Sequence, residues 1–322
     1  MGLFGMGRQG YGSSRGGGGF SLRILAGLAI AVIGIITYYS RTQTNPVTGE
    51  KQHISMTVDQ EKALGLQAAP EMASQMGGEA DPQTDPAARL VAEVGSRLVK
   101  NTEAGKSPYV GNFNFYLLKD PNTINAFALP GGQVFITRAL FDKLQDESQL
   151  AGVLGHEVGH VINRHSAEHM AKGQLGSTLV GAVAVGASDD QRRGAMAAAA
   201  AAMANQMLQL KYSRGDESES DAYGLKLMAQ AGYDPRGMLD VMQVLKSAGG
   251  GGKQPQWMLT HPLPENRLDE IKQIIAQTYP NGVPSQLSRG RDLHGGAPAL
   301  AGDRGNRIQR NEAPRQGAND KW

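Results

Sequence analysis

Residues 153–162 read Val-Leu-Gly-His-Glu-Val-Gly-His-Val-Ile, and this stretch predicts a buried helix that holds functional side chains. On a helix, His156 and His160 lie one turn apart on the same face. The apolar residues around them cover most of the other faces, so the helix is expected in the core. Buried imidazoles need polar partners, and a metal ion supplies one. Gly155 and Gly159 are poor helix formers, which indicates close packing at a functional position.

The chain of 322 residues has no cysteine, so any metal must be held by nitrogen and oxygen atoms. Two imidazoles and a carboxylate suit Zn²⁺. Glu157 projects about 100° round the helix from His156, where it can reach a water molecule on the metal without binding the metal itself. We therefore expect one zinc ion per chain, which lowers the pKa of the water, and Glu157 as the general base.

A catalytic zinc site keeps three protein ligands and one open position, so a third ligand is needed. Residues 216–221 read Asp-Glu-Ser-Glu-Ser-Asp and supply candidates. Glu217 and Asp221 share a helix face, and we take Glu217 as the ligand. Asp221 would accept a hydrogen bond from a ligand histidine and fix its tautomer. Glu219 is expected to face solvent. The alternative for this segment is a solvated acidic helix start, favoured by the helix dipole.

Two further histidines follow the motif. Residues 138–170 look helical throughout, as two helices that meet near residues 146–148, with Ser148 capping the second. On a continuous helix, His165 and His169 would lie about 180° from the two motif histidines. We therefore expect them to have structural or surface roles and to take no part in the metal site.

A short sheet is predicted just before these helices. Residues 113–118 alternate as in a strand, and residues 125–129 and 133–137 read as a hairpin around Pro130-Gly131-Gly132. Peptidases commonly hold a substrate as an extra strand on a sheet edge, so this hairpin is expected to bind extended polypeptide. The candidate contact residues are Asn125, Ala126 and Phe127.

Most of the remaining folded chain is expected to be helical, which makes the fold α+β and mostly helical; the His-Glu-Val-Gly-His motif at residues 156–160, which is typical of zinc peptidases, makes the expected domain a zincin-like metallopeptidase domain. The Ala-rich residues 171–210 are interrupted by the polar residues 188–193, which favours a hairpin of two amphipathic helices over a second membrane span. The apolar spacing predicts further helices over residues 58–76, 86–100, 214–230, 235–247 and 265–278.

The N-terminal region predicts a membrane anchor over residues 22–39. Its apolar core is uncharged, Arg23 can snorkel, and Tyr38 and Tyr39 fit an interfacial aromatic belt. Arginines before the span keep the N-terminus cytoplasmic, which would place the catalytic domain in the periplasm of a bacterium, attached to the inner membrane by one span. The alternatives are a cleaved signal peptide, which would release the domain to the periplasm, and a buried core helix.

The predicted organisation has five segments. The 43 glycines cluster near both ends and around residues 249–252, outside a folded middle. The net charge of +2 gives no argument for a nucleic-acid partner. The segments are a disordered N-terminus (1–21), an anchor (22–39), a polar linker (40–57), the metallopeptidase domain (58–283) and a disordered tail (284–322).

Four motifs in this order resemble the HtpX and CaaX-prenyl-protease type of zinc metallopeptidase. They are Asn125 to Phe135, His156 to His160, Tyr212 to Asp221, and Thr260 to Arg267. The resemblance implies a gluzincin fold and a zinc ligand at Glu217, and it is nearest to the single-domain periplasmic members of the BepA and LoiP sort. HtpX-type proteins have several spanning helices, whereas one is predicted here.

The resemblance also favours site roles for two residues of the last motif. His261 could stabilise the oxyanion of the tetrahedral intermediate, or it could bind zinc as a fourth ligand and hold the enzyme inactive. Arg267 could polarise the intermediate or pair with an acid. The alternative is that Thr260-His261-Pro262 is only a turn before a helix.

The sequence therefore predicts a zinc-dependent endopeptidase that hydrolyses unfolded or misassembled envelope and membrane proteins. The alternative is an envelope chaperone or assembly factor whose zinc site is structural or rarely active. The intact Glu157 favours the enzyme, because a structural zinc site does not require a general base.

Overall fold

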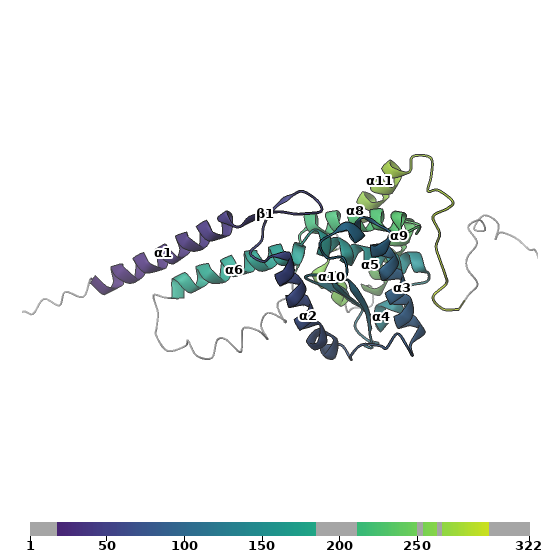
Figure 1. Cartoon of the computed structure of the whole chain (residues 1–322), viewed down its shortest axis with the longest axis horizontal. Helices are drawn as coiled ribbons and strands as arrows, with labels where there is room; N and C mark the ends of the chain where they lie inside the picture. Colours follow the sequence, from purple (N-terminus) through teal and green to yellow (C-terminus); the bar gives the residue numbers. More distant parts are fainter. Residues whose placement is uncertain (1–17, 185–210, 250–253, 263–265, 296–322) are drawn as a thin grey trace, which may run out of the picture.

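The computed structural model describes residues 18–184, 211–249, 254–262 and 266–295 (Figure 1). The protein is mostly helical with two small sheets, which confirms the predicted α+β class. The helices are α1 (Gly18–Ser40), α2 (Val58–Gln75), α3 (Pro86–Lys100), the 3₁₀ turn η1 (Glu103–Lys106), α4 (Arg138–Phe141), α5 (Glu147–Ile162), α6 (His165–Ala184), α8 (Arg214–Gln230), α9 (Arg236–Gly249), α10 (Gln256–Thr260) and α11 (Arg267–Thr278). The strands are β1 (Thr42–Thr44), β2 (Lys51–His53), β3 (Asn114–Leu118), β4 (Ala126–Leu129) and β5 (Gln133–Thr137).

The larger sheet has the order β3-β5-β4. β4 and β5 form the predicted antiparallel hairpin, and β3 runs parallel to β5. The turn needs glycine because Gly131 and Gly132 have φ angles of 82° and 110°, a region that side chains disfavour. β5 is buried along its whole length, and β4 forms an edge of the sheet.

Helix α5 lies within the globular part of the protein, among the other helices (Figure 1), and every one of its residues is buried. The helix packs against α3, α8 and α9 and against β4. Its N-cap is Asp146, whose carboxylate accepts the Gln149 N–H at 3.0 Å. This corrects the prediction that Ser148 caps the helix. Ser148 lies inside the first turn and donates its hydroxyl to Asp146 at 2.6 Å.

The predicted continuous helix through residue 170 is wrong, because the chain breaks between α5 and α6. Arg164 has a φ of 59°, the one non-glycine residue with positive φ among the described residues. Its buried guanidinium pairs with Glu61 of α2 and donates to the Met56 carbonyl at 3.0 Å. Tyr109 also donates to Glu61, at 2.8 Å. These distant contacts stabilise a backbone conformation that costs a non-glycine residue about 1 kcal/mol or more.

Helices α1 and α6 lie side by side and extend away from the rest of the protein (Figure 1). Apolar side chains of α1 are exposed, among them Leu25 and Ile33 at 60% and 62%. Within the parts of the chain that are described, no helix has both the length and the apolar content that a membrane crossing requires. The predicted anchor is thus not confirmed. The predicted second helix of the Ala-rich hairpin falls outside the described residues.

The predicted polar linker and the first part of the predicted disordered tail both pack on the rest of the protein. Residues 40–57 contain the β1–β2 hairpin, in which the buried amides of Asn45 and Gln52 bond to the Ile162 and Asn163 carbonyls at the end of α5. Residues 284–295 pack along α5 and α9, where Arg291 pairs with Glu147. Each segment places only one or two apolar side chains against the core, Val47 and Ile54 in the first and Leu293 in the second, which is too few to give an apolar periodicity.

Candidate active site

Four buried side chains from three parts of the chain converge on one point. His156 and His160 come from α5, Glu217 from α8, and His261 directly follows α10. One ligand atom from each of them lies within 4.8 Å of the others. His160 Nε2 is 3.0 Å from His156 Nε2 and 3.4 Å from Glu217 Oε1. The three residues predicted from spacing therefore meet, and His261 joins them.

The donor set fits a zinc ion. His156 Nε2 lies 3.0 Å from His160 Nε2 and 3.3 Å from His261 Nδ1. Ligands about 2.0 Å from a tetrahedral zinc are roughly 3.3 Å from one another, so these separations match. The other ring nitrogens of His156 and His160 are hydrogen-bonded elsewhere, so two lone pairs face each other, an arrangement that a shared cation stabilises.

The electrostatics keep two of these side chains in their metal-binding forms. Burial lowers the pKa of His160 well below its usual value, so the imidazole is neutral. Burial alone would raise the pKa of Glu217, but the neighbouring His261, through its charge and its hydrogen bond, lowers it well below normal. A neutral imidazole and an ionised carboxylate are the forms that bind metal.

Asp221 and Arg267 contact two of the ligand side chains, His156 and Glu217. Asp221 Oδ1 accepts the His156 Nδ1–H at 2.9 Å, as predicted for a residue that fixes the tautomer. The Arg267 guanidinium bonds both Asp221 oxygens, at 2.7 and 2.8 Å, and lies 2.5 Å from Glu217 Oε2. Burial raises the pKa of Asp221, but Arg267 outweighs this effect and lowers it. Of the two roles considered for Arg267, the geometry matches pairing with acids.

Glu157 lies beside the cluster and not in it. Its Oε1 accepts the indole N–H of Trp257 at 3.2 Å and is 3.7 Å from His261 Nε2. The Trp257 ring stacks on His261, with centroids 4.5 Å apart. Sequence reasoning missed Trp257, because a tryptophan in a short segment after a Gly-rich loop carries no periodic signal. Tyr212 also covers the site, its ring stacked on His160 at 3.9 Å.

The break before α6 changes the positions of the two later histidines. The prediction that His165 lies on the far side of the helix is wrong, because its Nδ1 lies 2.9 Å from His160 Nδ1. His169 pairs with Asp216 at 2.7 Å. Neither belongs to the metal-ligand group found among the described residues. Glu219 has a half-exposed carboxylate, in line with its expected solvent-facing position, and it contacts His165.

The edge strand lies next to α10. The Trp257 backbone N–H donates to the Ile124 carbonyl at 3.2 Å, immediately before β4. Asn125 is buried, and its Oδ1 has no hydrogen-bond partner in the described part of the protein. Ala126 is buried and Phe127 is half-buried. The residues predicted to bind substrate are thus next to the segment that carries His261.

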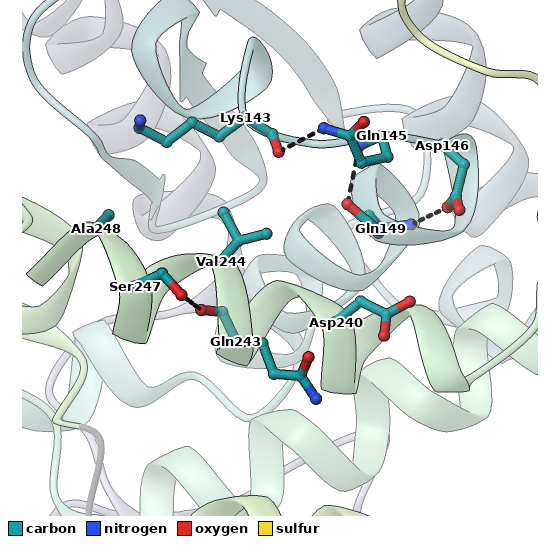
Figure 2. A pocket seen from close by; sticks show the side chains of 9 residues that line it. All are labelled: Lys143, Gln145, Asp146, Gln149, Asp240, Gln243, Val244, Ser247 and Ala248. Carbon is teal, nitrogen blue, oxygen red and sulfur yellow. Dashed lines mark hydrogen bonds between the residues drawn. The ribbon is translucent and has the colours of Figure 1, made fainter. Parts of the chain in front are cut away.

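A surface pocket of about 610 Å³ lies away from this cluster (Figure 2). Asp240, Gln243 and Ser247 of α9 line one side, and the segment before α5 lines the other. Its polar groups bond to one another, as Gln149 does with the backbone N–H of Gln145 at 2.8 Å. No residue of the metal cluster lines this pocket.

The site combines two histidines one helical turn apart, a glutamate from a distant helix and an adjacent glutamate that is not a metal ligand. This combination is typical of a metal-dependent peptidase of the zincin class. Residues 86–275 match peptidase family M48, and the chain belongs to this family. Zinc is the metal that this family uses, and the residues present fit it.

Curated relatives agree with this assignment. The beta-barrel assembly-enhancing protease of Yersinia pestis is 32% identical over 246 residues, 74% of this chain and 49% of that protein. The protein of the same name from Escherichia coli K12 is 30% identical over 260 residues, 78% and 52% of the two chains. The mitochondrial metalloendopeptidase OMA1 of Schizosaccharomyces pombe is 29% identical over 258 residues, 77% and 71%. The chain spans about half the length of the two bacterial relatives.

Proposed function

We propose that this protein is a zinc-dependent endopeptidase that cleaves unfolded or misassembled envelope proteins. The convergence of His156, His160 and Glu217 beside the carboxylate of Glu157, which is not one of the ligand group, carries the proposal. Family membership supports the hydrolytic chemistry. The bacterial relatives are named as proteases that enhance β-barrel assembly, which supports the envelope as the setting.

In the proposed mechanism, His156, His160 and Glu217 would hold the zinc, which would supply Lewis acidity and lower the pKa of water. Glu157 accepts the proton of the attacking water and passes it to the leaving amine. The indole N–H of Trp257 orients Glu157, since it donates to one carboxylate oxygen and leaves the other free for the proton. Asp221 holds the His156 ring in its ligand tautomer, and Arg267 holds Asp221.

The substrate binds as an added strand on the edge of β4 that pairs with no other strand in the described part of the chain. Main-chain hydrogen bonds recognise extended polypeptide with little regard to sequence, which suits unfolded substrates. Asn125 Oδ1, a buried acceptor that has no hydrogen-bond partner among the described residues, would receive a backbone N–H of the substrate. Phe127, half-buried on the same strand, would contact a substrate side chain.

His261 would be a fourth zinc ligand in a closed state of the protein. Its Nδ1 is 3.3 Å from His156 Nε2 and 2.9 Å from Glu217 Oε1, and it is buried. A catalytic zinc needs an open coordination position. Substrate binding at β4 would move the adjacent segment that carries Trp257 and His261, which would free that position.

Residues 22–39 anchor the protein in the bacterial inner membrane, with the catalytic domain in the periplasm. The support is the uncharged stretch from Ile24 to Tyr39, with Ile33 and Leu25 exposed. The measurement is extraction of membranes with alkaline carbonate. We expect the membranes to retain the full chain and to release a chain that starts after Tyr39. Release of both chains would contradict the anchor.

Cleavage of casein by the full chain tests the catalytic proposal, with the wild type compared with Glu157→Gln. The wild type should cleave casein and the variant should not, while both hold one zinc per chain, because Glu157 does not bind the metal. Equal cleavage by both would exclude the mechanism. Zinc binding without cleavage by either would favour an envelope chaperone or assembly factor with a structural zinc.

A further inference from the structure

We propose that His165 and Glu219 form a relay that positions the zinc ligand His160, as a counterpart to the Asp221–His156 pair. The inference rests on the proposed zinc site and adds to it two positioning residues. It starts from an unusual contact, since the His160 ring nitrogen that does not face the cluster meets another imidazole. His160 Nδ1 lies 2.9 Å from His165 Nδ1, and both residues are 1% exposed.

With Glu219 ionised and His165 neutral, the hydrogen bonds along the relay allow one assignment of protons. Glu219, when ionised, only accepts, so the His165 Nε2 that lies 3.1 Å from its Oε2 carries the hydrogen. A neutral His165 then has a lone pair on Nδ1, which accepts the Nδ1–H of His160. That tautomer of His160 leaves its Nε2 lone pair free, directed at the cluster. The carboxylate thus fixes the metal-binding tautomer through an intervening imidazole.

The position of His165 depends on the break between α5 and α6. Arg164, with its φ of 59°, turns the chain so that the next residue faces back toward α5. Glu219 and Ser220 of α8 close the other side, with Ser220 Oγ 3.3 Å from His165 Nδ1. The buried Arg164–Glu61 pair that fixes this backbone is thereby connected to the orientation of a ligand.

The neighbouring His169 shows that the contact is specific. It lies on the same helix one turn later and also pairs with an acid of α8, Asp216, at 2.7 Å. No hydrogen bond joins His169 to a residue of the metal cluster among the described contacts. His169 therefore serves as a matched control, since its replacement removes a similar histidine–carboxylate pair without touching a zinc ligand.

The experiment measures zinc affinity of the full chain in detergent by competition with a chromogenic chelator. His165→Leu should weaken zinc binding about 10- to 100-fold, the usual effect of losing a partner of a ligand histidine. His165→Asn should recover most of this loss, because its amide oxygen can accept at the position of Nδ1. His169→Leu should bind zinc as the wild type does. The visible absorption of the Co²⁺-loaded protein should change in His165→Leu only.

Glu219→Gln gives a second test that a folding defect cannot obscure, since the side chain is half-exposed. It should weaken zinc binding, by less than His165→Leu, with unchanged circular dichroism. If His165→Leu folds and keeps the zinc affinity and Co²⁺ absorption of the wild type, the relay is overturned. If His165→Leu does not fold, unchanged zinc affinity in Glu219→Gln overturns it. Failure of the wild type to bind zinc would overturn the proposed function as well, so the two failures are distinguishable.

Discussion

Gly159 of α5 and Ser220 of α8 touch backbone to backbone beside the metal cluster. A Cβ added at Gly159 would lie 2.8 Å from the Ser220 carbonyl oxygen and 2.9 Å from its Cα. This contact brings α5 and α8 close enough for His160 Nε2 and Glu217 Oε1 to approach to 3.4 Å. Glycine, a poor helix former, thus occupies position 159 of α5 because a side chain there would push α5 and α8 apart and separate the zinc ligands that they carry.

Gly159→Ala should destabilise the protein by about 1–3 kcal/mol, because overpacking of this contact outweighs the gain in helix propensity. It should also weaken zinc binding. Gly215→Ala is the control, since its new methyl group would meet only Ser213 Oγ, at 3.6 Å, and α8 should be unchanged or slightly more stable. Urea unfolding and chelator competition measure both effects. A Gly159→Ala protein with wild-type stability and zinc affinity would show that the contact is loose.

Trp257→Phe should lower kcat for casein about 10-fold and leave the zinc content unchanged. The variant keeps an aromatic ring against His261 but removes the N–H that donates to Glu157 at 3.2 Å. A hydrogen bond to a charged group is worth about 1.5–3 kcal/mol, and 1.4 kcal/mol corresponds to a tenfold change in rate. A zinc-loaded variant with unchanged kcat would show that Glu157 needs no support from Trp257.

Asp85→Ala should lower the unfolding free energy by about 1 kcal/mol near neutral pH, because Asp85 is the N-cap of α3 and also pairs with Arg138. Burial raises the pKa of Asp85, but the bond from the Ala88 N–H and the charge of Arg138 outweigh burial and lower it below 3.8. Its stabilisation is therefore complete above pH 3.8 and is lost as the pH falls through the lower folded pKa.

The measurement is urea unfolding of the wild type and Asp85→Ala near pH 7 and near pH 3. The difference between the two proteins should shrink at the lower pH. Asp85→Asn, which keeps an acceptor at the cap, should lose less stability and show a weaker pH dependence. A difference that stays constant with pH would mean that the charge of Asp85 contributes nothing.

Local periodicity sufficed to predict the parts of the site that one helix holds. His156 and His160 share a face because of helix geometry, and so do Glu217 and Asp221, whatever the rest of the chain does. The β4–β5 hairpin follows from its glycine turn. In each case the signal and the structure span fewer than about a dozen residues, which is the range over which propensities act.

The features that sequence reasoning missed depend on distant contacts. The turn at Arg164 requires Glu61, which lies 103 positions earlier, and without it a continuous helix is the better guess. That wrong guess placed His165 on the far side of α5. Trp257 reaches Glu157 across 100 positions. Pairing at such separations leaves no trace in the spacing of a single sequence.

His261→Ala should raise the rate of casein cleavage and modestly weaken zinc binding. The variant removes the fourth donor, whose Nδ1 is 3.3 Å from His156 Nε2, and so opens the coordination position that catalysis needs. If His261 instead stabilised the oxyanion, its loss would lower kcat about 10²–10³-fold. The sign of the change in rate therefore separates the two roles, provided that zinc content is measured on the same samples. A fall in kcat with zinc retained would contradict the closed state, and His261 would then act on the substrate.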